Sequence, residues 1–241
     1  MDQHLREIHR ALHPHRRPNP FASDLFNSRF AVWHVPAAMQ RQLSRSGYGF
    51  SSASHARQRN IWRHVWENAG VLELRLQCLW PLLMASREQR MKQWRDIQWF
   101  CARIENWCEA DYLASMTAQC LEQQPSRVLP VLQRWNRHRD PWLRRQSLTG
   151  LFYYQRLRGQ QPPLESVLAH LESQLDAPEH YVQKAVGWVL REAWQVYPQQ
   201  LQRWLAGRLA RMQSAALTTM LEKANAEETR DWRMQHRLAQ R

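Results

Sequence analysis

Apolar residues recur at helical spacing along most of this 241-residue chain, and this periodicity limits its fold more than any other feature. The segment HYVQKAVGWVLREAWQVYP, residues 180–198, shows it clearly, with steps of i, i+3, i+4 and i+7 linking Val182, Ala185, Val186, Val189, Leu190 and Ala193. The chain has only 7 Gly, its prolines fall mostly between such segments, and few stretches alternate with period two. These features predict an all-α fold.

The periodic segments come in pairs. We expect helices at about 21–31 and 36–46, 56–68 and 70–86, 88–105 and 108–122, 125–137 and 141–158, 163–174 and 178–196, and 198–211 and 214–223, with a polar last segment at 225–238 that frays. Pro81 should kink or split the helix in which it lies. The period of about 38–43 residues lies in the HEAT range.

A single HEAT-like pair cannot bury its apolar faces alone, so neighbouring pairs must stack. The sequence therefore predicts one domain, 1–241, built as a right-handed α-solenoid of HEAT-like antiparallel helix pairs with a concave basic groove. Residues 1–20, which carry three prolines, are expected to form a loosely ordered arm with a short helix.

The charge of the chain predicts a polyanionic partner. The net charge is +13 and the pI is near 10.6. Of the 34 basic residues 31 are Arg, which binds phosphate in a forked geometry and stacks on rings. Residues 1–60 carry +6 and residues 127–160 carry +7, so the charge is concentrated in two blocks that suit a binding surface. Two solvated Arg-rich faces are the alternative.

The cysteines and the hydropathy indicate a cytoplasmic protein that binds no metal. Cys78, Cys101, Cys108 and Cys120 show no CxxC spacing, so we interpret them as reduced helix residues. No signal peptide and no 18-residue apolar span is present, which predicts neither secretion nor a membrane partner. We expect no cofactor, a monomer, and a location in the bacterial cytoplasm, associated with the nucleoid when DNA is bound.

Three helices place unusual side chains away from their apolar stripes. Trp188 lies roughly 140° from the middle of its stripe, beside Lys184 and Arg191. Trp107 and Asp111 are four residues apart on the polar side of their helix, and Arg145 lies opposite the stripe of the helix between. In a solenoid these residues could line one concave strip. The ordinary alternatives are a Trp that fills a groove between repeats and an Asp that caps a helix or pairs with a cation.

Three stretches, WCEAD, DPWLRRQSL and YVQKAVGWVLRE, carry a resemblance to a known family. They resemble landmarks of the DNA alkylation repair family, the AlkD-like HEAT-repeat alkylpurine DNA glycosylases. The resemblance covers about residues 56–223 and is best at 105–198, and residues 1–55 show no convincing match. Cys108 stands where the family commonly has an acidic residue, which leaves Glu109 as a nearby acid.

The resemblance implies an active site of Asp111, Trp107 and Trp188 with Arg145 on a phosphate. It implies a monofunctional glycosylase that hydrolyses the N-glycosidic bond of cationic N3- or N7-alkylated purines in duplex DNA, an early step of base excision repair. The carboxylate would stabilise an oxocarbenium-like state and hold the attacking water. The indoles would pack against the deoxyribose. The cations expected on the DNA are Arg145, Arg144, Lys184, Arg191, Arg156, Arg57 and Arg59.

Three other functions remain open at this point. One is a catalytically silent family member that binds bent, branched or damaged DNA, and another is a HEAT scaffold for an acidic protein. The third is a bifunctional lyase with Lys184 as a Schiff-base nucleophile, which would need a lowered pKa at that lysine.

Overall fold

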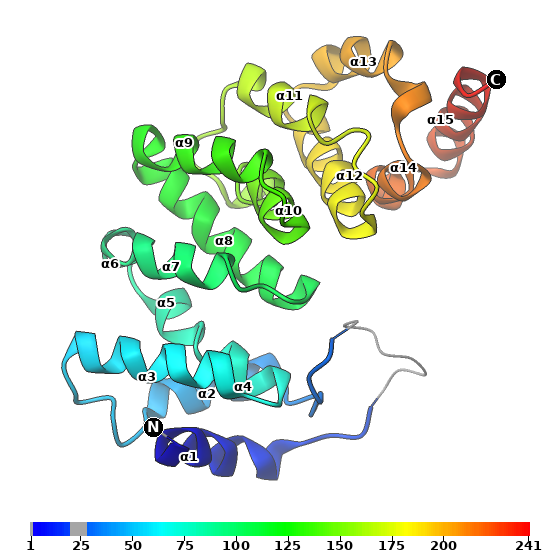
Figure 1. Ribbon diagram of the computed structural model, residues 1–241. Coiled ribbons are helices and arrows are strands. Elements are labelled where there is room, and N and C mark those ends of the chain that lie inside the picture. Colours follow the sequence, from blue (N-terminus) through cyan, green and yellow to red (C-terminus); the bar gives the residue numbers. More distant parts are fainter. Residues whose placement is uncertain (1, 20–27) are drawn as a thin grey trace. The chain divides into compact units, whose positions relative to one another are not determined.

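The structure, a computed structural model, describes residues 2–19 and 28–241, and its regular elements in these residues are helices joined by turns and irregular connections (Figure 1). No strand occurs in the described part of the chain, where one isolated parallel bridge joins Ala31 to Val71. The predicted all-α class is confirmed. By its internal contacts the chain divides into two compact units, Met1–Trp99 with Glu105–Tyr112, and Phe100–Ile104 with Leu113–Arg241. The unit boundary falls within helix α8 (Trp107–Gln123).

The first unit is built around the buried helix α4 (Leu72–Gln77), all six residues of which are buried. Packed around it are α1 (Asp2–Leu12), α2 (Ala37–Ser46), α3 (His55–Asn68) and α5 (Trp80–Met84). The unit also includes α6 (Arg87–Lys92) and most of α7 (Trp94–Cys101). Arg75 of α4 lies over the rings of Trp66 and Phe30, 4.1 and 4.3 Å from their centroids, which lets a cation sit among aromatic core side chains.

The second unit has the two-row arrangement of a HEAT-like repeat (Figure 1). One row consists of α9 (Pro125–Asn136), α11 (Leu164–Glu172) and α13 (Pro198–Ala206). The other consists of α10 (Pro141–Thr149), α12 (His180–Trp194) and α14 (Ser214–Met220), where α12 packs against both α10 and α14. The last helix, α15 (Ala226–Ala239), follows. Pro125, Pro141 and Pro198 each occupy a first helical position, as the sequence predicts.

Glycine sets the closest helix contact of the second unit. A Cβ atom built on Gly187 would lie 2.2 Å from the carbonyl oxygen of Ala216 and 2.8 Å from the Cβ of Thr219. Only glycine lets α12 approach α14 this closely, and this contact fixes the helical phase of Trp188, the next residue.

The N-terminal and C-terminal segments are better ordered than expected. Residues 2–12, predicted as part of a loose arm, form α1, in which Ile8 and Leu12 are fully buried. Burial of two aliphatic side chains outweighs the effect of the prolines, which all follow the helix. Similarly, α15 begins with a capping box formed by Asn225 and Glu228 and buries His236, so it does not fray.

Several predicted helices are shorter than expected. Residues 70–86 form α4 and α5, split near Pro81 as predicted, and residues 88–105 form α6 and α7. Residues 141–158 form α10 only to Thr149, and Gly150 follows in a close contact in which a Cβ would lie 2.6 Å from Thr117 Cγ2. The helix predicted at 21–31 lies largely outside the described residues. No described helix is long and apolar enough to cross a membrane.

Candidate active site and nucleic-acid interface

The start of α8 holds Trp107 and Asp111 in a defined phase. Asn106 caps the helix, its Oδ1 accepting the Glu109 N–H at 3.0 Å, while a Glu109 carboxylate oxygen accepts the Glu105 N–H at 2.9 Å. These two hydrogen bonds, one from Glu109 to Asn106 and one from Glu105 to Glu109, fix the first turn. Trp107 and Asp111, one turn apart, are both half-buried, so neither belongs to the core and neither is fully exposed.

Three other acids of the first unit, Glu73, Glu105 and Glu109, have defined protein partners. Glu109 is fully buried and pairs with Arg75, 2.5 Å away, and burial raises the pKa of this carboxyl. Glu105 pairs with Arg29. Glu73 accepts the backbone N–H groups of Trp33 and Val35 at 3.0–3.3 Å. Glu109, which the sequence leaves as a nearby acid, is therefore structural.

The Cys108 thiol lies close enough to Asp111 for the charge of the carboxylate to affect its pKa. Burial raises the pKa of the Cys108 thiol to about 12, and the negative charge of Asp111 adds to this effect. The side chain between Trp107 and Glu109 is therefore a neutral thiol at physiological pH. All four cysteines are free and three are buried. Cys101, Cys108 and Cys120 lie in helices, whereas Cys78 lies in the turn after α4.

In the second unit Trp188 is buried, which contradicts its expected exposed position. Its side chain is 8% exposed, with the rings of Tyr154 and Tyr153 at centroid distances of 5.1 and 5.6 Å. The indole N–H is buried and has no hydrogen-bond partner. Arg156 and Lys223 lie 5.5 and 5.9 Å from the Tyr154 ring. Trp188 therefore belongs to an aromatic cluster with cations at its edge.

The expected exposure of Arg145 and Arg191 is also wrong. Arg145 is 4% exposed, and its Nη1 donates to the carbonyl oxygen of Tyr181 at 2.9 Å. Arg191 is buried and pairs with Glu192 and Glu222. Both arginines lie on flanks that neighbouring helices cover, so their positions opposite the apolar stripes are not open to solvent.

Among the other predicted DNA-binding cations, some bind acids or carbonyl oxygens of the protein itself and others do not. Arg144 donates to the carbonyl oxygens of His138 and Arg139 at 2.9 and 3.0 Å and pairs with Glu179, so it braces the loop before α10. Arg59 approaches Asp96 at 4.0 Å. By contrast, three cations form no ion pair and are half-buried or exposed: Lys184, Arg156 and Arg57.

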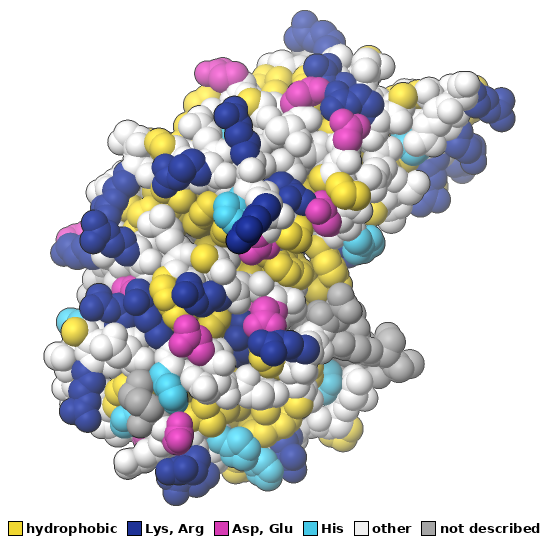
Figure 2. All heavy atoms as spheres, in the orientation of Figure 1, with side chains coloured by type: hydrophobic (Ala, Val, Ile, Leu, Met, Phe, Trp, Pro, Cys, Tyr) yellow, Lys and Arg dark blue, Asp and Glu magenta, His cyan; other side chains and the backbone are white. Residues whose placement is uncertain are grey.

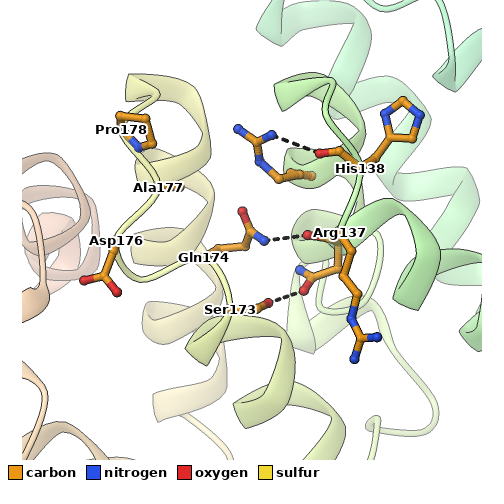
Figure 3. Close-up of a pocket in the computed structure, with 9 residues that line it drawn as sticks. Arg137, His138, Ser173, Gln174, Asp176, Ala177 and Pro178 are labelled. Atoms are coloured by element: carbon orange, nitrogen blue, oxygen red, sulfur yellow. Dashed lines mark hydrogen bonds between the residues drawn. The ribbon is translucent and has the colours of Figure 1, made fainter.

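A pocket of about 390 Å³ lies between the α9–α10 and α11–α12 connections (Figure 3). Gln174 donates to the Asn136 carbonyl oxygen at 2.5 Å and Ser173 to the Asn136 side chain, so hydrogen bonds tie the two connections together. Arg137 and His138 line it from the α9–α10 side. Of the predicted site residues only Arg144 lines this pocket, so it is separate from the predicted catalytic residues.

The structure thus brings some of the predicted site residues together and leaves others apart. Trp107 and Asp111 share one face of α8, and Arg57 and Arg59 lie on α3 of the same unit. Arg144, Arg145, Arg156, Lys184, Trp188 and Arg191 belong to the second unit. There Arg191 lies 5.8 Å from the Trp188 ring. An active site that joins Asp111 to Trp188 stays a prediction.

A comparison with protein families decides the family of this chain. The model of the family described as DNA alkylation repair enzyme matches residues 15–224. The chain belongs to the DNA alkylation repair enzyme family. The match begins well before residue 56 and so includes most of the N-terminal block for which the sequence showed no convincing resemblance. No curated protein matches the sequence.

Solved structures share the fold of this DNA alkylation repair family member. A predicted DNA alkylation repair enzyme from Enterococcus faecalis matches with a TM-score of 0.65 and 14% identity, over 82% of this chain and 90% of that one. AlkD2 from Streptococcus mutans matches with a TM-score of 0.52 and 13% identity, over 83% and 87%. The protein smu.31 from Streptococcus mutans UA159 gives 0.53 and 15%, over 84% and 90%. These likenesses confirm the helical-repeat fold.

The sequence analysis missed Tyr153 and Tyr154 as companions of Trp188. The helix predicted at 141–158 in fact ends at Thr149, so Tyr153 and Tyr154 lie in the connection that follows it. The pair of tyrosines directly after LTGLF was the available signal, because two adjacent aromatic residues in a connection need a ring partner when they are half-buried.

Proposed function

We propose that this chain is a monofunctional DNA glycosylase that hydrolyses the N-glycosidic bond of cationic N3- or N7-alkylated purines in duplex DNA. Membership of the DNA alkylation repair enzyme family gives the substrate its class. The observation that supports the chemistry is the position of Asp111, a half-buried carboxylate one turn after the half-buried Trp107 on the same helix.

An alkylated purine is already a good leaving group, because alkylation at N3 or N7 makes the base a cation. As the bond breaks, positive charge moves to the deoxyribose. A carboxylate near that sugar stabilises the charge and orients the attacking water, and this electrostatic contribution is typically the largest in such sites. In this proposal Asp111 supplies the carboxylate and Trp107 packs against the sugar.

The DNA backbone would be held by the cations that have no acidic partner, chiefly Lys184, Arg156 and Arg57. Arg144, Arg145 and Arg191 would act mainly by positioning the helices that carry them, since their guanidinium groups already have protein partners. Double-stranded DNA is then the partner, with no cofactor required for the hydrolysis.

A duplex containing 7-methylguanine, incubated with the protein, tests the proposal. Free 7-methylguanine should appear at a rate above that of spontaneous depurination, and an unmodified duplex should release no guanine. Absence of release from a folded protein that binds the duplex would overturn the enzymatic part of the proposal.

The second candidate is a catalytically silent protein that binds bent, branched or damaged DNA. The burial of Trp188 beneath Tyr153 and Tyr154 favours it, because a covered indole does not contact a sugar without a rearrangement. Salt-sensitive DNA binding with equal affinity for alkylated and unmodified duplex, and no base release, would support this candidate instead.

A further inference from the structure

A cluster of imidazole rings surrounds Trp33 in the first unit, away from every residue used above. His9 and His13, one turn apart, stack at a centroid distance of 5.5 Å. Each ring meets the Trp33 indole nearly edge-on, at 4.8 Å for His9 and 5.4 Å for His13. His9 and Trp33 are half-buried and His13 is exposed, so the cluster has one face in solvent.

The segment that follows α1 adds a permanent positive charge to this cluster. The Arg16 guanidinium lies 5.7 Å from the centroid of Trp33. The next residue fixes the segment in place, because the Arg17 N–H donates to the Trp33 carbonyl oxygen at 2.9 Å. Figure 2 shows histidine side chains next to Lys and Arg side chains over the first unit.

Three described acids on the elements that carry or pack against this cluster are bound to backbone or side-chain donors. On α1, Glu7 accepts the Gly49 N–H at 2.6 Å and Asp2 approaches His64 at 3.2 Å. From α4, the buried Glu73 accepts the backbone N–H groups of Trp33 and Val35. Burial lowers the pKa of His9, and the positive charges of His13 and Arg16 lower it further. In the described part of the chain the cluster therefore brings two imidazoles and a guanidinium around one indole, where a bound anion would favour the charged form of His9.

We propose that His9, His13 and Arg16 around Trp33 form a phosphate-binding site for the DNA backbone, with an affinity that rises as the imidazoles become protonated. The inference rests on the proposed function for the identity of its ligand. A phosphate oxygen accepts hydrogen bonds from protonated imidazole and from guanidinium, and its negative charge removes the repulsion between the three cations.

The site lies close enough to the start of α8 for one DNA strand to reach both. Arg29 pairs with Glu105, two residues before Trp107, and Trp33 follows Arg29 by four residues. Four residues span at most about 14 Å. At about 3.4 Å per nucleotide along one strand, this distance corresponds to about four nucleotides. The site would therefore hold the strand a few nucleotides from the alkylated base.

The test is the pH dependence of duplex affinity between pH 5.5 and 8 at fixed salt. Affinity should rise as pH falls, by up to about tenfold per pH unit for each proton taken up on binding. The His9→Gln/His13→Gln variant should lose this rise, and His13→Gln alone, at an exposed position, should lose part of it. His55→Gln, an exposed histidine of α3, should behave like wild type. Arg16→Ala should lower the salt slope by about 0.9 at every pH.

Two further measurements separate this inference from the proposed function. Release of 7-methylguanine by the double histidine variant, measured beside wild type, reports on the proposed catalytic residues, whereas the pH profile of duplex affinity reports on the phosphate site. Base release by wild type together with an equal pH profile in wild type and double variant would overturn the phosphate site alone. A pH-dependent affinity that the double variant loses, without base release, would support the site and overturn the proposed function.

Inorganic phosphate serves as the second probe, followed through the imidazole signals of the full chain by NMR. Signals of His9 and His13 should shift with phosphate and with duplex alike. A shift with inorganic phosphate, combined with unchanged duplex affinity in the variants, would identify a site for the free ion and contradict the assignment to DNA.

Discussion

Replacing Trp188 by alanine should lower the free energy of unfolding by about 4 kcal/mol. A tryptophan buries about 150–250 Å² on folding, and this one is only 8% exposed. At about 25 cal/mol per Å² the lost burial alone gives about 3.5–6 kcal/mol. The buried indole N–H has no partner, so removing it returns part of that cost. Measured deletions of large aromatic side chains, about 3–5 kcal/mol, agree with this range.

Denaturant unfolding followed by circular dichroism measures this loss, and thermal unfolding should show a midpoint lowered by about 8–16 °C. Trp188→Phe keeps most of the ring and removes the unpartnered N–H, so it should cost about 1 kcal/mol or less. Trp232→Ala, at a half-buried position on α15, should cost clearly less than Trp188→Ala. A Trp188→Ala protein as stable as wild type would refute the packing reasoning and restore the exposed position expected from the sequence.

Three other expectations follow from the structure. Gly187→Ala should destabilise the protein by about 3 kcal/mol, because its Cβ would meet the Ala216 carbonyl oxygen. Gly207→Ala, where nothing lies within 4 Å of the added Cβ, should be neutral or stabilising, and chemical denaturation compares the two variants. Glu109→Gln should lower the free energy of unfolding by about 3 kcal/mol, because it leaves the charged Arg75 in the core without its carboxylate partner. The control Glu88→Gln, at an exposed ion pair, should lower it by less than about 0.5 kcal/mol in the same assay. Burial lowers the pKa of His170 below its unfolded value of 6.5, so the folded state binds fewer protons than the unfolded state. The free energy of unfolding should therefore fall as pH drops through 6.5, and His170→Gln should flatten this pH dependence.

Helical periodicity predicted most element positions because it depends on local spacing alone. Helices α3, α8, α9, α12 and α14 begin within two residues of their expected positions. The failures lie where a tertiary contact decides the local structure. α10 ends at Thr149, just before the close contact of Gly150 with Thr117, and Ile8 with Leu12 stabilises α1 against the rest of the first unit.

The exposed face of a helix was harder to predict than the helix itself. An amphipathic stripe identifies one buried side, but α12 packs against α10 and α14 on its two flanks as well. Its buried set therefore includes Gln183, Gly187, Trp188 and Arg191, none of which the stripe contains. Gln183 shows how such flanks are satisfied, because its side-chain amide donates to the carbonyl oxygens of Gln174, Leu175 and Ala177 at 2.7–3.2 Å. No single-helix pattern reveals a partner of this kind.

The positions of Asp111 and Trp107 agree better with the prediction, which placed both on the polar side of their helix. Both stay outside the core because the first turn of α8 is capped by Asn106, and Glu109 turns inward to Arg75, which leaves the opposite face of that turn half-buried. The resemblance to the DNA alkylation repair family pointed to the same two residues, and the family match confirms the family to which that resemblance referred.

The rate of 7-methylguanine release by Asp111→Asn tests the central claim most directly, since this change keeps the shape of the side chain and removes its charge. A carboxylate that stabilises an oxocarbenium-like state should, when lost, slow release by roughly 100-fold or more at unchanged or slightly higher duplex affinity. Asp231→Asn, an exposed carboxylate on α15, should release the base at the wild-type rate. Wild-type release by Asp111→Asn, with an active wild type beside it, would contradict the assignment of the catalytic carboxylate.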